Sequence, residues 1–249
     1  MKRFLTALVV ALGLSVPIIP AQADEMTAQD AAEYLSKSIV QVSDKASGDP
    51  FCTAWKVAPK VYATAGHCAT DGEIFLNAED FDWAKVKAVT VGIGEKEAND
   101  KPKDWALLHT MTDLEDVVPL PLACEVELNV GLPIAYLGYG YPAVPYLGVG
   151  YIASMDIEKA RGNAAEIALS THVAGGASGA PVVELDGGKV IGIVTELVPS
   201  PRVGVIGTGM EGIVEGICDA AQVHTGKTPI EVDIDIDVKT NVNETLGSH

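Results

Sequence analysis

Three side chains of this sequence, His67, Asp104 and Ser178, have the types that nucleophilic catalysis requires. A serine hydroxyl is a poor nucleophile until a base within hydrogen-bonding reach takes its proton. Imidazole suits that task because its pKa lies near neutrality, and a carboxylate on the far ring nitrogen fixes its tautomer. The three residues together predict hydrolysis through an acyl-enzyme intermediate.

His67 directly follows a short apolar run, whereas Asp104 and Ser178 each precede one, and such runs favour β-strands. Ser178 also lies among glycines, and only a turn free of bulky side chains lets backbone amides converge on the oxyanion of a tetrahedral intermediate. The three sequences are Thr64-Ala65-Gly66-His67-Cys68, Asp104-Trp105-Ala106-Leu107-Leu108 and Gly175-Gly176-Ala177-Ser178-Gly179-Ala180-Pro181.

The elements that must position these residues are predicted to be mostly strands. The chain has 249 residues, and its 25 glycines and 14 prolines separate many short apolar segments, which predicts a β-sandwich or β-barrel. A short helix is expected over residues 27–38 and a closing helix over 212–223. The predicted strands are 39–42, 52–57, 61–64, 88–91, 134–137, 151–153, 167–170, 181–183 and 190–194.

The first 23 residues have the layout of a secretory signal peptide. A cationic start precedes an uncharged apolar run over residues 4–19, and the small residues that follow predict cleavage after Ala23. An uncleaved membrane anchor is disfavoured, because Pro17 and Pro20 leave an apolar helix shorter than a bilayer span. We therefore expect export to the periplasm or the extracellular space, with no membrane span in the mature chain.

A proline-rich segment at residues 117–121 predicts the boundary between two halves of the mature chain. The expected organisation is a first half over 24–117, a second half over 118–228 and an acidic tail over 229–249. Apolar and charged residues alternate over 230–239, which is typical of either a strand with one acidic face or a solvated tail. A calcium site is a weaker third interpretation, because the tail lacks the glycine turn that wraps oxygen ligands around the ion.

The net charge limits the classes of binding partner, and the cysteine content indicates the cellular compartment. The formal net charge of −17 disfavours nucleic acid as a partner, because an acidic surface repels phosphates. The four cysteines form no C-x-x-C pair, which argues against zinc and favours disulfides in an oxidising compartment. Spacing alone leaves all three pairings open among Cys52, Cys68, Cys124 and Cys218.

The three sequences around His67, Asp104 and Ser178, in this chain order, resemble the trypsin-like (chymotrypsin-fold) serine peptidases of the exported bacterial type. The resemblance extends over residues 36–222. It implies an all-β fold of two packed antiparallel β-barrels with a short C-terminal helix, and catalytic groups in the cleft between the barrels. Ser178 would be the nucleophile, His67 the general base and then acid, and Asp104 the orienting carboxylate.

The resemblance also implies an oxyanion hole and a substrate pocket. The backbone amides of Gly176 and Ser178 would form the hole. In the pocket, Val173 and Leu197 favour an apolar or medium-sized side chain, whereas Glu196 and the acidic surface favour cationic peptides through electrostatic steering. The pocket residues implied are His172, Val173, Thr195, Glu196 and Leu197.

Two disulfides follow from the same resemblance. Cys52 would pair with Cys68 and brace the loop that carries the base. Cys124 would then pair with Cys218 and tie the start of the second half to the closing helix.

The sequence departs from the family pattern at two positions. Animal digestive members have an aspartate just before the serine that receives the newly cut N-terminus, and this chain has Ala177 there. We therefore expect no dependence on a newly exposed N-terminus. Val194 stands where the glutamyl-endopeptidase-like branch has a substrate-reading histidine, which argues against glutamate specificity.

The leading interpretation is an exported serine endopeptidase that acts on polypeptides and needs no cofactor or metal. The alternative is a catalytically silent binding or regulatory protein that keeps the double-barrel fold, because a fold alone does not specify a function. A silent relative is expected to lack a triad residue, and this sequence lacks none. An α/β-hydrolase esterase is disfavoured by the chain order and by the lack of a G-x-S-x-G sequence. The sequence makes no prediction of oligomeric state.

Overall fold

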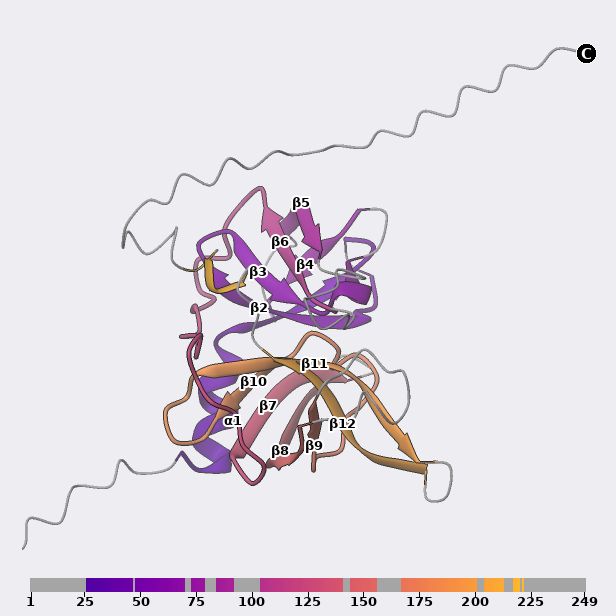
Figure 1. Ribbon diagram of the computed structural model, residues 1–249. Coiled ribbons are helices and arrows are strands. Elements are labelled where there is room, and N and C mark those ends of the chain that lie inside the picture. The colour runs from indigo at the N-terminus through magenta and orange to yellow at the C-terminus, as the bar shows by residue number, and fades with distance from the viewer. Residues whose placement is uncertain are drawn as a thin grey trace, which may run out of the picture.

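The short strands form two closed antiparallel barrels in a computed structural model, one barrel stacked on the other (Figure 1). The expected signal peptide (1–23) and the acidic tail (229–249), with its alternating segment, lie outside the residues that the structure describes. The described residues are 26–46, 48–69, 73–78, 84–91, 104–140, 144–155, 167–200, 204–212, 217–219 and 221.

The first barrel closes in the order β1-β2-β3-β6-β5-β4. Every neighbouring pair in it is antiparallel, as strands joined by short connections require. The three-residue strand β4 was not predicted from the sequence. The strands are β1 (Ile39–Ser43), β2 (Cys52–Ala58), β3 (Val61–Thr64), β4 (Phe75–Asn77), β5 (Ala84–Val91) and β6 (Ala106–Thr110).

The second barrel closes in the order β10-β11-β12-β9-β8-β7, again with antiparallel pairs. The two barrels confirm the predicted fold class. The strands are β7 (Pro133–Gly140), β8 (Val144–Ser154), β9 (Ile167–Leu169), β10 (Pro181–Glu184), β11 (Val190–Ser200) and β12 (Gly204–Gly212).

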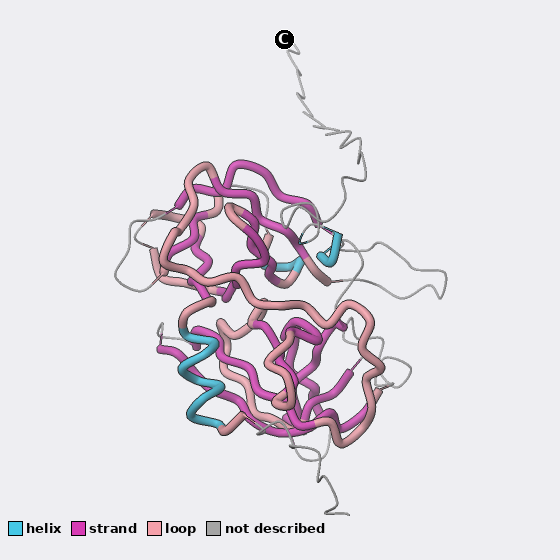
Figure 2. Tube along the Cα trace, turned by 90° about the vertical axis from the view of Figure 1, so that its left-hand side faces the viewer, coloured by secondary structure: helices cyan, strands magenta, loops and turns pink. Residues whose placement is uncertain are grey.

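Helices are few in the described chain. α1 (Ala28–Ser36) begins at a capping box in which Thr27 and Asp30 bond each other's backbone amides, and it packs along β7 and β8 of the second barrel (Figure 2). The closing helix was predicted to start at Gly212, which is wrong, because that residue ends β12; residues 217–219 and 221 are helical. None of the helices in the described part of the chain is long and apolar enough to cross a membrane.

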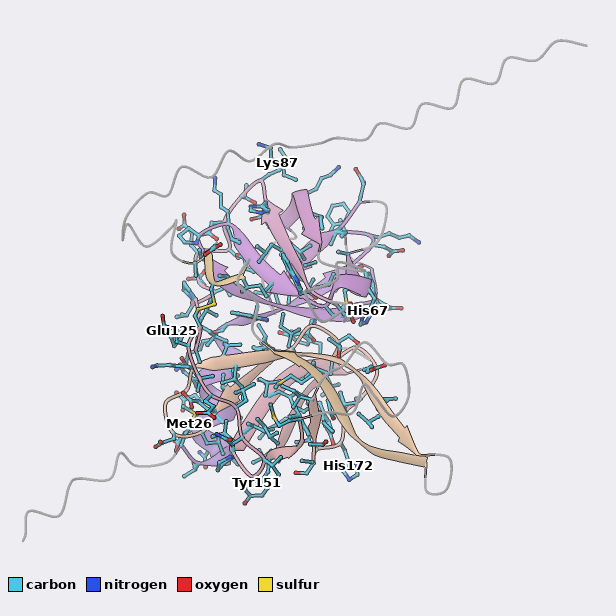
Figure 3. The ribbon with its side chains drawn as sticks, in the orientation of Figure 1. Met26, His67, Lys87, Glu125, Tyr151 and His172 are labelled. Atoms are coloured by element: carbon cyan, nitrogen blue, oxygen red, sulfur yellow. A yellow bond between two sulfur atoms is a disulfide. The ribbon has the colours of Figure 1, made fainter. Side chains whose placement is uncertain are left out.

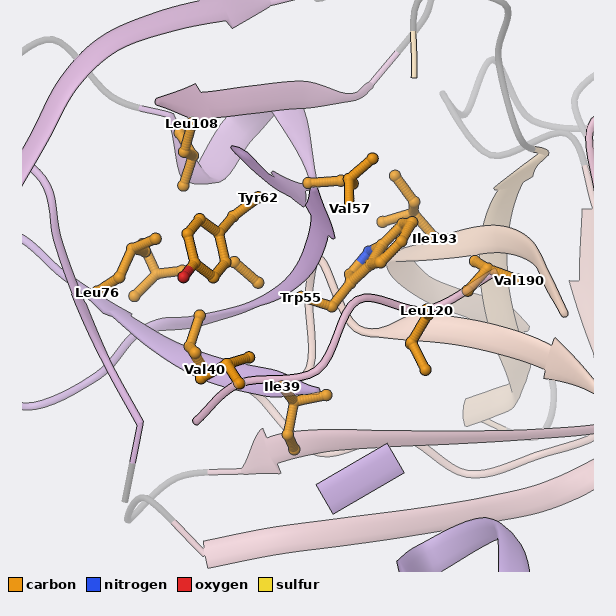
Figure 4. Close-up of a cluster of buried hydrophobic side chains, with 14 of the residues drawn as sticks. Ile39, Val40, Trp55, Val57, Tyr62, Leu76, Leu108, Leu120, Val190 and Ile193 are labelled. Atoms are coloured by element: carbon orange, nitrogen blue, oxygen red, sulfur yellow. The ribbon is translucent and has the colours of Figure 1, made fainter. Parts of the chain in front are cut away.

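One hydrophobic core joins the two barrels. β2 is buried along its whole length, because its residues face both the interior of the first barrel and the second barrel. Tyr62 lies among side chains inside the first barrel, whereas Trp55 of β2 lies towards Ile193 and Val190 of β11 (Figure 4). This shared core fixes the first barrel against the second, so residues from both can form one site.

A buried ion pair stabilises the first barrel. The Lys56 ammonium, with its side chain 4% exposed, lies 2.9 Å from Asp113 Oδ1 and also donates to the Leu114 carbonyl. Asp113 accepts further bonds from the Tyr62 hydroxyl and the Lys60 amide. Burial favours the protonated acid, but the hydrogen bonds from Lys56 and Lys60 outweigh it and lower the pKa of Asp113 below 3.8.

We expect Asp113→Ala to lower the free energy of unfolding by about 3–5 kcal/mol, because it leaves the Lys56 ammonium buried without its counter-ion. Urea unfolding of the two proteins at neutral pH measures the difference. Glu33→Ala is the matched control, since the Glu33–Lys37 pair is exposed and is expected to contribute about 0.5 kcal/mol or less. Equal losses in the two variants would contradict the role given to the buried pair. In the wild type, its contribution is present above pH 3.8 and is lost as the pH falls through the lowered pKa of Asp113.

Candidate active site

Neighbouring strand ends bring His67 and Asp104 together. β3 pairs with β6 in an antiparallel register that sets Thr64 opposite Ala106. The chain leaving β3 therefore lies beside the chain entering β6. His67 follows β3 in the short 3-10 helix η1 (Gly66–Cys68), and it lies at the edge of the first barrel that faces the second (Figure 3).

The His67 ring and the Asp104 carboxylate form a close pair. Nδ1 of His67 lies 2.8 Å from Asp104 Oδ2, and the His67 backbone amide donates to Asp104 Oδ1 at 2.8 Å. Asp104 is buried at 8% exposure, whereas the His67 side chain is 47% exposed. The hydrogen bond to Asp104 raises the pKa of His67 above 6.5, burial opposes the shift, and the charges of Asp104 and Glu196 add to it. The other ring nitrogen, Nε2, is thus the atom that can act as a base, and Asp104 stabilises the protonated ring.

Both implied disulfides are present. Cys52 of β2 bonds Cys68 of η1, next to His67, and Cys124 bonds Cys218 in the helical residues near the C-terminus. Cys52, His67 and Cys68 form one group of metal-ligand types among the described residues. The two sulfurs are bonded to each other and offer no thiolate, so the donor set does not fit a metal ion.

The turn that carries Ser178 is pressed against the first barrel. Gly176 and Gly179 have φ angles of +99° and +89°, which residues with a side chain rarely adopt. A Cβ atom on Gly179 would lie 2.0 Å from the Thr53 carbonyl oxygen. From the other side, a Cβ atom on Gly138 of β7 would lie 2.9 Å from the Ala180 Cβ. The close approach of other chain segments requires glycine at positions 179 and 138, and the φ angle favours it at position 176.

In this turn, three carbonyl groups accept hydrogen bonds, whereas two backbone amides have no hydrogen-bond acceptor within the described residues. The Gly176 carbonyl accepts from the Thr53 hydroxyl, the Ala177 carbonyl from the Ala180 amide, and the Ser178 carbonyl from the Thr53 amide. Within the described residues, the amides of Gly176 and Ser178 donate to no protein acceptor. Two unpaired amides flanking one residue are the arrangement that binds an oxyanion.

The Ser178 hydroxyl has a different hydrogen-bond partner from the one expected. It donates to the Thr195 carbonyl at 3.3 Å, and the structure has no hydrogen bond between Ser178 and His67. The two loops nevertheless touch, since Cys68 Sγ lies 3.7 Å from the Ser178 carbonyl oxygen. Rotation of Ser178 to another staggered χ1 rotamer redirects the hydroxyl, and in substrate-free enzymes such bonds are often long.

The predicted pocket residues lie in two segments of the second half, 172–173 and 195–197. Thr195 is buried beside Ser178, and its own hydroxyl has no hydrogen-bond partner in the described structure. Val173 is partly buried against the core of the second barrel, and Leu197 is 45% exposed. Glu196 is partly buried, and its charge reaches His67. His172 is exposed at the far end of the second barrel, well away from His67 (Figure 3).

Neither Thr53 nor Gly138 was identified from the sequence. Thr53 follows a cysteine in a buried strand, and its side-chain partners are 86 and 123 residues away in the sequence, so no local pattern indicates them. The closely spaced glycines at 138 and 140 were the one available signal of a close approach to β7.

Comparison with known proteins agrees with this architecture. A family model described as a trypsin-like peptidase domain matches residues 52–193. The glutamyl endopeptidase of Bacillus licheniformis is 24% identical over 196 residues, which cover 68% of this chain and 56% of that protein. The chain thus spans little more than half the length of that relative.

Solved structures show the same fold at low sequence identity. The HtrA-type protease AlgW, solved with a decapeptide, superposes with a TM-score of 0.60 at 16% identity, covering 80% of this chain and 68% of that chain. An inactivated protease paralogue of the scabies mite, S-D1, also has a TM-score of 0.60, at 11% identity, covering 80% of this chain and 96% of that chain. These two likenesses concern the fold alone.

Proposed function

The chain belongs to the trypsin-like peptidase family, and from this premise we propose that it is an exported serine endopeptidase. The observation that carries the proposal is the His67–Asp104 pair, bonded at 2.8 Å, beside a serine turn whose two amides are unpaired. Such a site provides a base, a nucleophile and an electrophilic pocket within one cleft.

The proposed reaction proceeds through an acyl-enzyme. Ser178 Oγ attacks the carbonyl carbon of the scissile peptide bond while His67 Nε2 takes the hydroxyl proton. Asp104 holds Nδ1 and stabilises the imidazolium, and the amides of Gly176 and Ser178 bind the negative oxygen of the tetrahedral intermediate. The C–N bond then breaks, and His67 gives its proton to the leaving amine. Water repeats the sequence on the ester, releasing the acid and restoring the Ser178 hydroxyl.

The second candidate is a catalytically silent protein of the same fold. One observation favours it: the Ser178 hydroxyl bonds the Thr195 carbonyl in place of His67. A silent protein has no need for a charged acid bonded to the edge of an exposed imidazole, however, and that pair favours the enzyme.

We propose that activity does not depend on a newly formed N-terminus. Ala177, the residue before the serine, is buried and carries no charge for an amine to pair with. The Met26 amide donates to the Leu185 carbonyl of the second barrel. The turn is instead held by Thr53 and by backbone bonds.

We further propose that the substrate is a polypeptide with a cationic residue near the scissile bond. Glu196 directly follows Thr195, whose carbonyl accepts the Ser178 hydroxyl, and its charge is near enough to act on His67. A lysine or arginine side chain bound in this cleft would meet that carboxylate. Val194 is buried and apolar, which gives a glutamate side chain no cationic partner at that position.

Replacing Glu196 by glutamine should move the acid limb of the kcat/KM profile to lower pH. His67 must be neutral to take the Ser178 proton, so the wild-type rate falls as the pH drops through a pKa above 6.5. The substitution removes one charge that raises this pKa, while Asp104 remains. The preference for lysine or arginine over a neutral residue should also fall by up to about fivefold, because an exposed ion pair contributes no more than about 1 kcal/mol.

Glu125→Gln is the matched control for this substitution. Glu125 is exposed and lies on the opposite side of the molecule from His67 (Figure 3), so it changes the net charge equally without facing the cleft. If both variants keep the wild-type pH profile and selectivity, Glu196 does not act on the site.

Export is part of the proposal. The signal-peptide pattern of residues 1–23 and two disulfides within one small protein both favour an oxidising compartment outside the cytoplasm.

The proposed function is tested by incubating the full-length secreted protein with a diverse peptide library and identifying new termini by mass spectrometry. We expect internal cleavages by the wild type that disappear in Ser178→Ala. Cleavage by both proteins would indicate a contaminant or another mechanism, and no cleavage by either would favour the silent protein.

A further inference from the structure

Thr53 belongs to the first barrel but bonds the catalytic turn of the second. It lies in β2, is fully buried, and its hydroxyl donates to the Gly176 carbonyl at 2.9 Å. The same hydroxyl accepts from the Tyr139 amide of β7 at 2.8 Å, and the Thr53 backbone amide donates to the Ser178 carbonyl at 2.8 Å. One residue therefore ties β7 and the serine turn to the first barrel.

The Thr53 backbone is itself held in place. Its carbonyl accepts the Thr64 hydroxyl at 2.7 Å, and Thr64 ends the strand that leads to His67. Cys52, the preceding residue, is bonded to Cys68. The segment that holds the serine turn is thus the segment that also anchors the loop of the base.

The two carbonyl groups that Thr53 holds flank the proposed oxyanion hole. The Gly176 and Ser178 carbonyls belong to the 176–177 and 178–179 peptides. Each of these peptides directly follows an α-carbon that carries an unpaired amide, so holding the two carbonyls restrains both of those α-carbons. Gly176 has a φ of +99° and no side chain, so steric contacts restrict its rotation little. Hydrogen bonds therefore restrain the 176–177 peptide, one from the Thr53 hydroxyl to the Gly176 carbonyl and one from the Ala177 amide to the Ala174 carbonyl.

We propose that Thr53 is a positioning residue that sets the oxyanion hole from the opposite barrel. This inference rests on the proposed peptidase function. It concerns the hydroxyl group: the backbone bond to Ser178 is available to any residue at this position, whereas the bonds to Gly176 and Tyr139 require a group that donates and accepts at once. Serine can replace it in this role, and valine, which has the same shape, cannot.

The experiment compares Thr53→Val with Thr53→Ser and with the control Thr110→Val. Thr110 is a buried threonine of the same barrel whose hydroxyl bonds only the Lys60 carbonyl among its described partners, away from the turn. We expect T53V to lower kcat by about 10- to 100-fold, less than the loss of an oxyanion donor, with KM changed less than twofold. T53S and T110V should remain within about threefold of the wild type.

A transition-state analogue separates positioning from general stability. The affinity of a peptide aldehyde, whose adduct with Ser178 places an oxyanion in the hole, should fall in T53V by the same factor as kcat/KM. Rates are expressed per active site after titration, so partial unfolding does not count. A lowered melting midpoint with unchanged kcat and aldehyde affinity would overturn the inference, and so would equal losses in T53V and T53S.

Amide hydrogen exchange tests the role of Thr53 even if the proposed peptidase function is wrong. If the wild type neither cleaves peptides nor binds the aldehyde, the peptidase proposal fails, and exchange in residues 174–180 still tests the positional claim. T53V should exchange faster there than the wild type and T110V should not. Unchanged exchange in T53V would refute the role of Thr53.

Discussion

His67→Ala should lower kcat by about 10⁶-fold while the protein keeps its fold. Removing the base of such a triad costs about as much as removing the whole triad, because Ser178 then has no group to take its proton. The side chain is 47% exposed, so its loss leaves no cavity in the core. Steady-state hydrolysis of a peptide found in the library measures the loss.

The fold of the His67→Ala variant is checked separately. Its thermal midpoint should match that of the wild type, and both disulfides should remain by mass spectrometry. Peptide cleavage at more than a few per cent of the wild-type rate would mean that another group serves as the base.

Asp104→Asn should lower kcat by about 10⁴-fold, because the asparagine favours the wrong imidazole tautomer. Asp104 uses both carboxylate oxygens, one for the His67 amide and one for Nδ1. Asparagine has a single oxygen for these two donors. When its NH₂ group faces Nδ1, the ring proton moves to Nε2, and the ring can no longer accept the serine proton.

The control for this variant is Asp116→Asn. Asp116 is exposed, and its substitution removes the same charge from the first half of the chain. It should stay near the wild-type rate. A D104N variant as active as D116N would show that the carboxylate does not orient His67.

Much of the fold was predictable because the barrel strands carry local signals. The β-branched runs of β3, β10 and β11 are bounded by turn residues. The capping box of α1 can be recognised from the four residues 27–30. β12 was missed because its four glycines read as a turn. At least one is required by packing, since a Cβ atom on Gly207 would lie 2.4 Å from the Leu169 carbonyl oxygen. Such a requirement appears only once β9 is known to lie beside β12.

In the candidate site, too, some features follow from local sequence and others depend on how the barrels pack. His67, Asp104 and Ser178 are each marked by a short sequence, and strand pairing brings the first two together. The partner of the Ser178 hydroxyl and the contacts of Thr53 depend on how the two barrels pack, which no local pattern contains. The specificity pocket stays a prediction, and its residue His172 lies well away from His67 (Figure 3).

The central claim is that one hydroxyl in the cleft is activated by the neighbouring imidazole. Reaction of the secreted protein with a fluorophosphonate, followed by intact-mass and peptide mapping, tests this without knowledge of the substrate. We expect one adduct per molecule, on Ser178, none in Ser178→Ala, and labelling slowed at least about 1,000-fold in His67→Ala, because Ser178 then has no base to take its proton. A wild type that stays unlabelled, or a Ser178→Ala variant labelled as fast as the wild type, would contradict it.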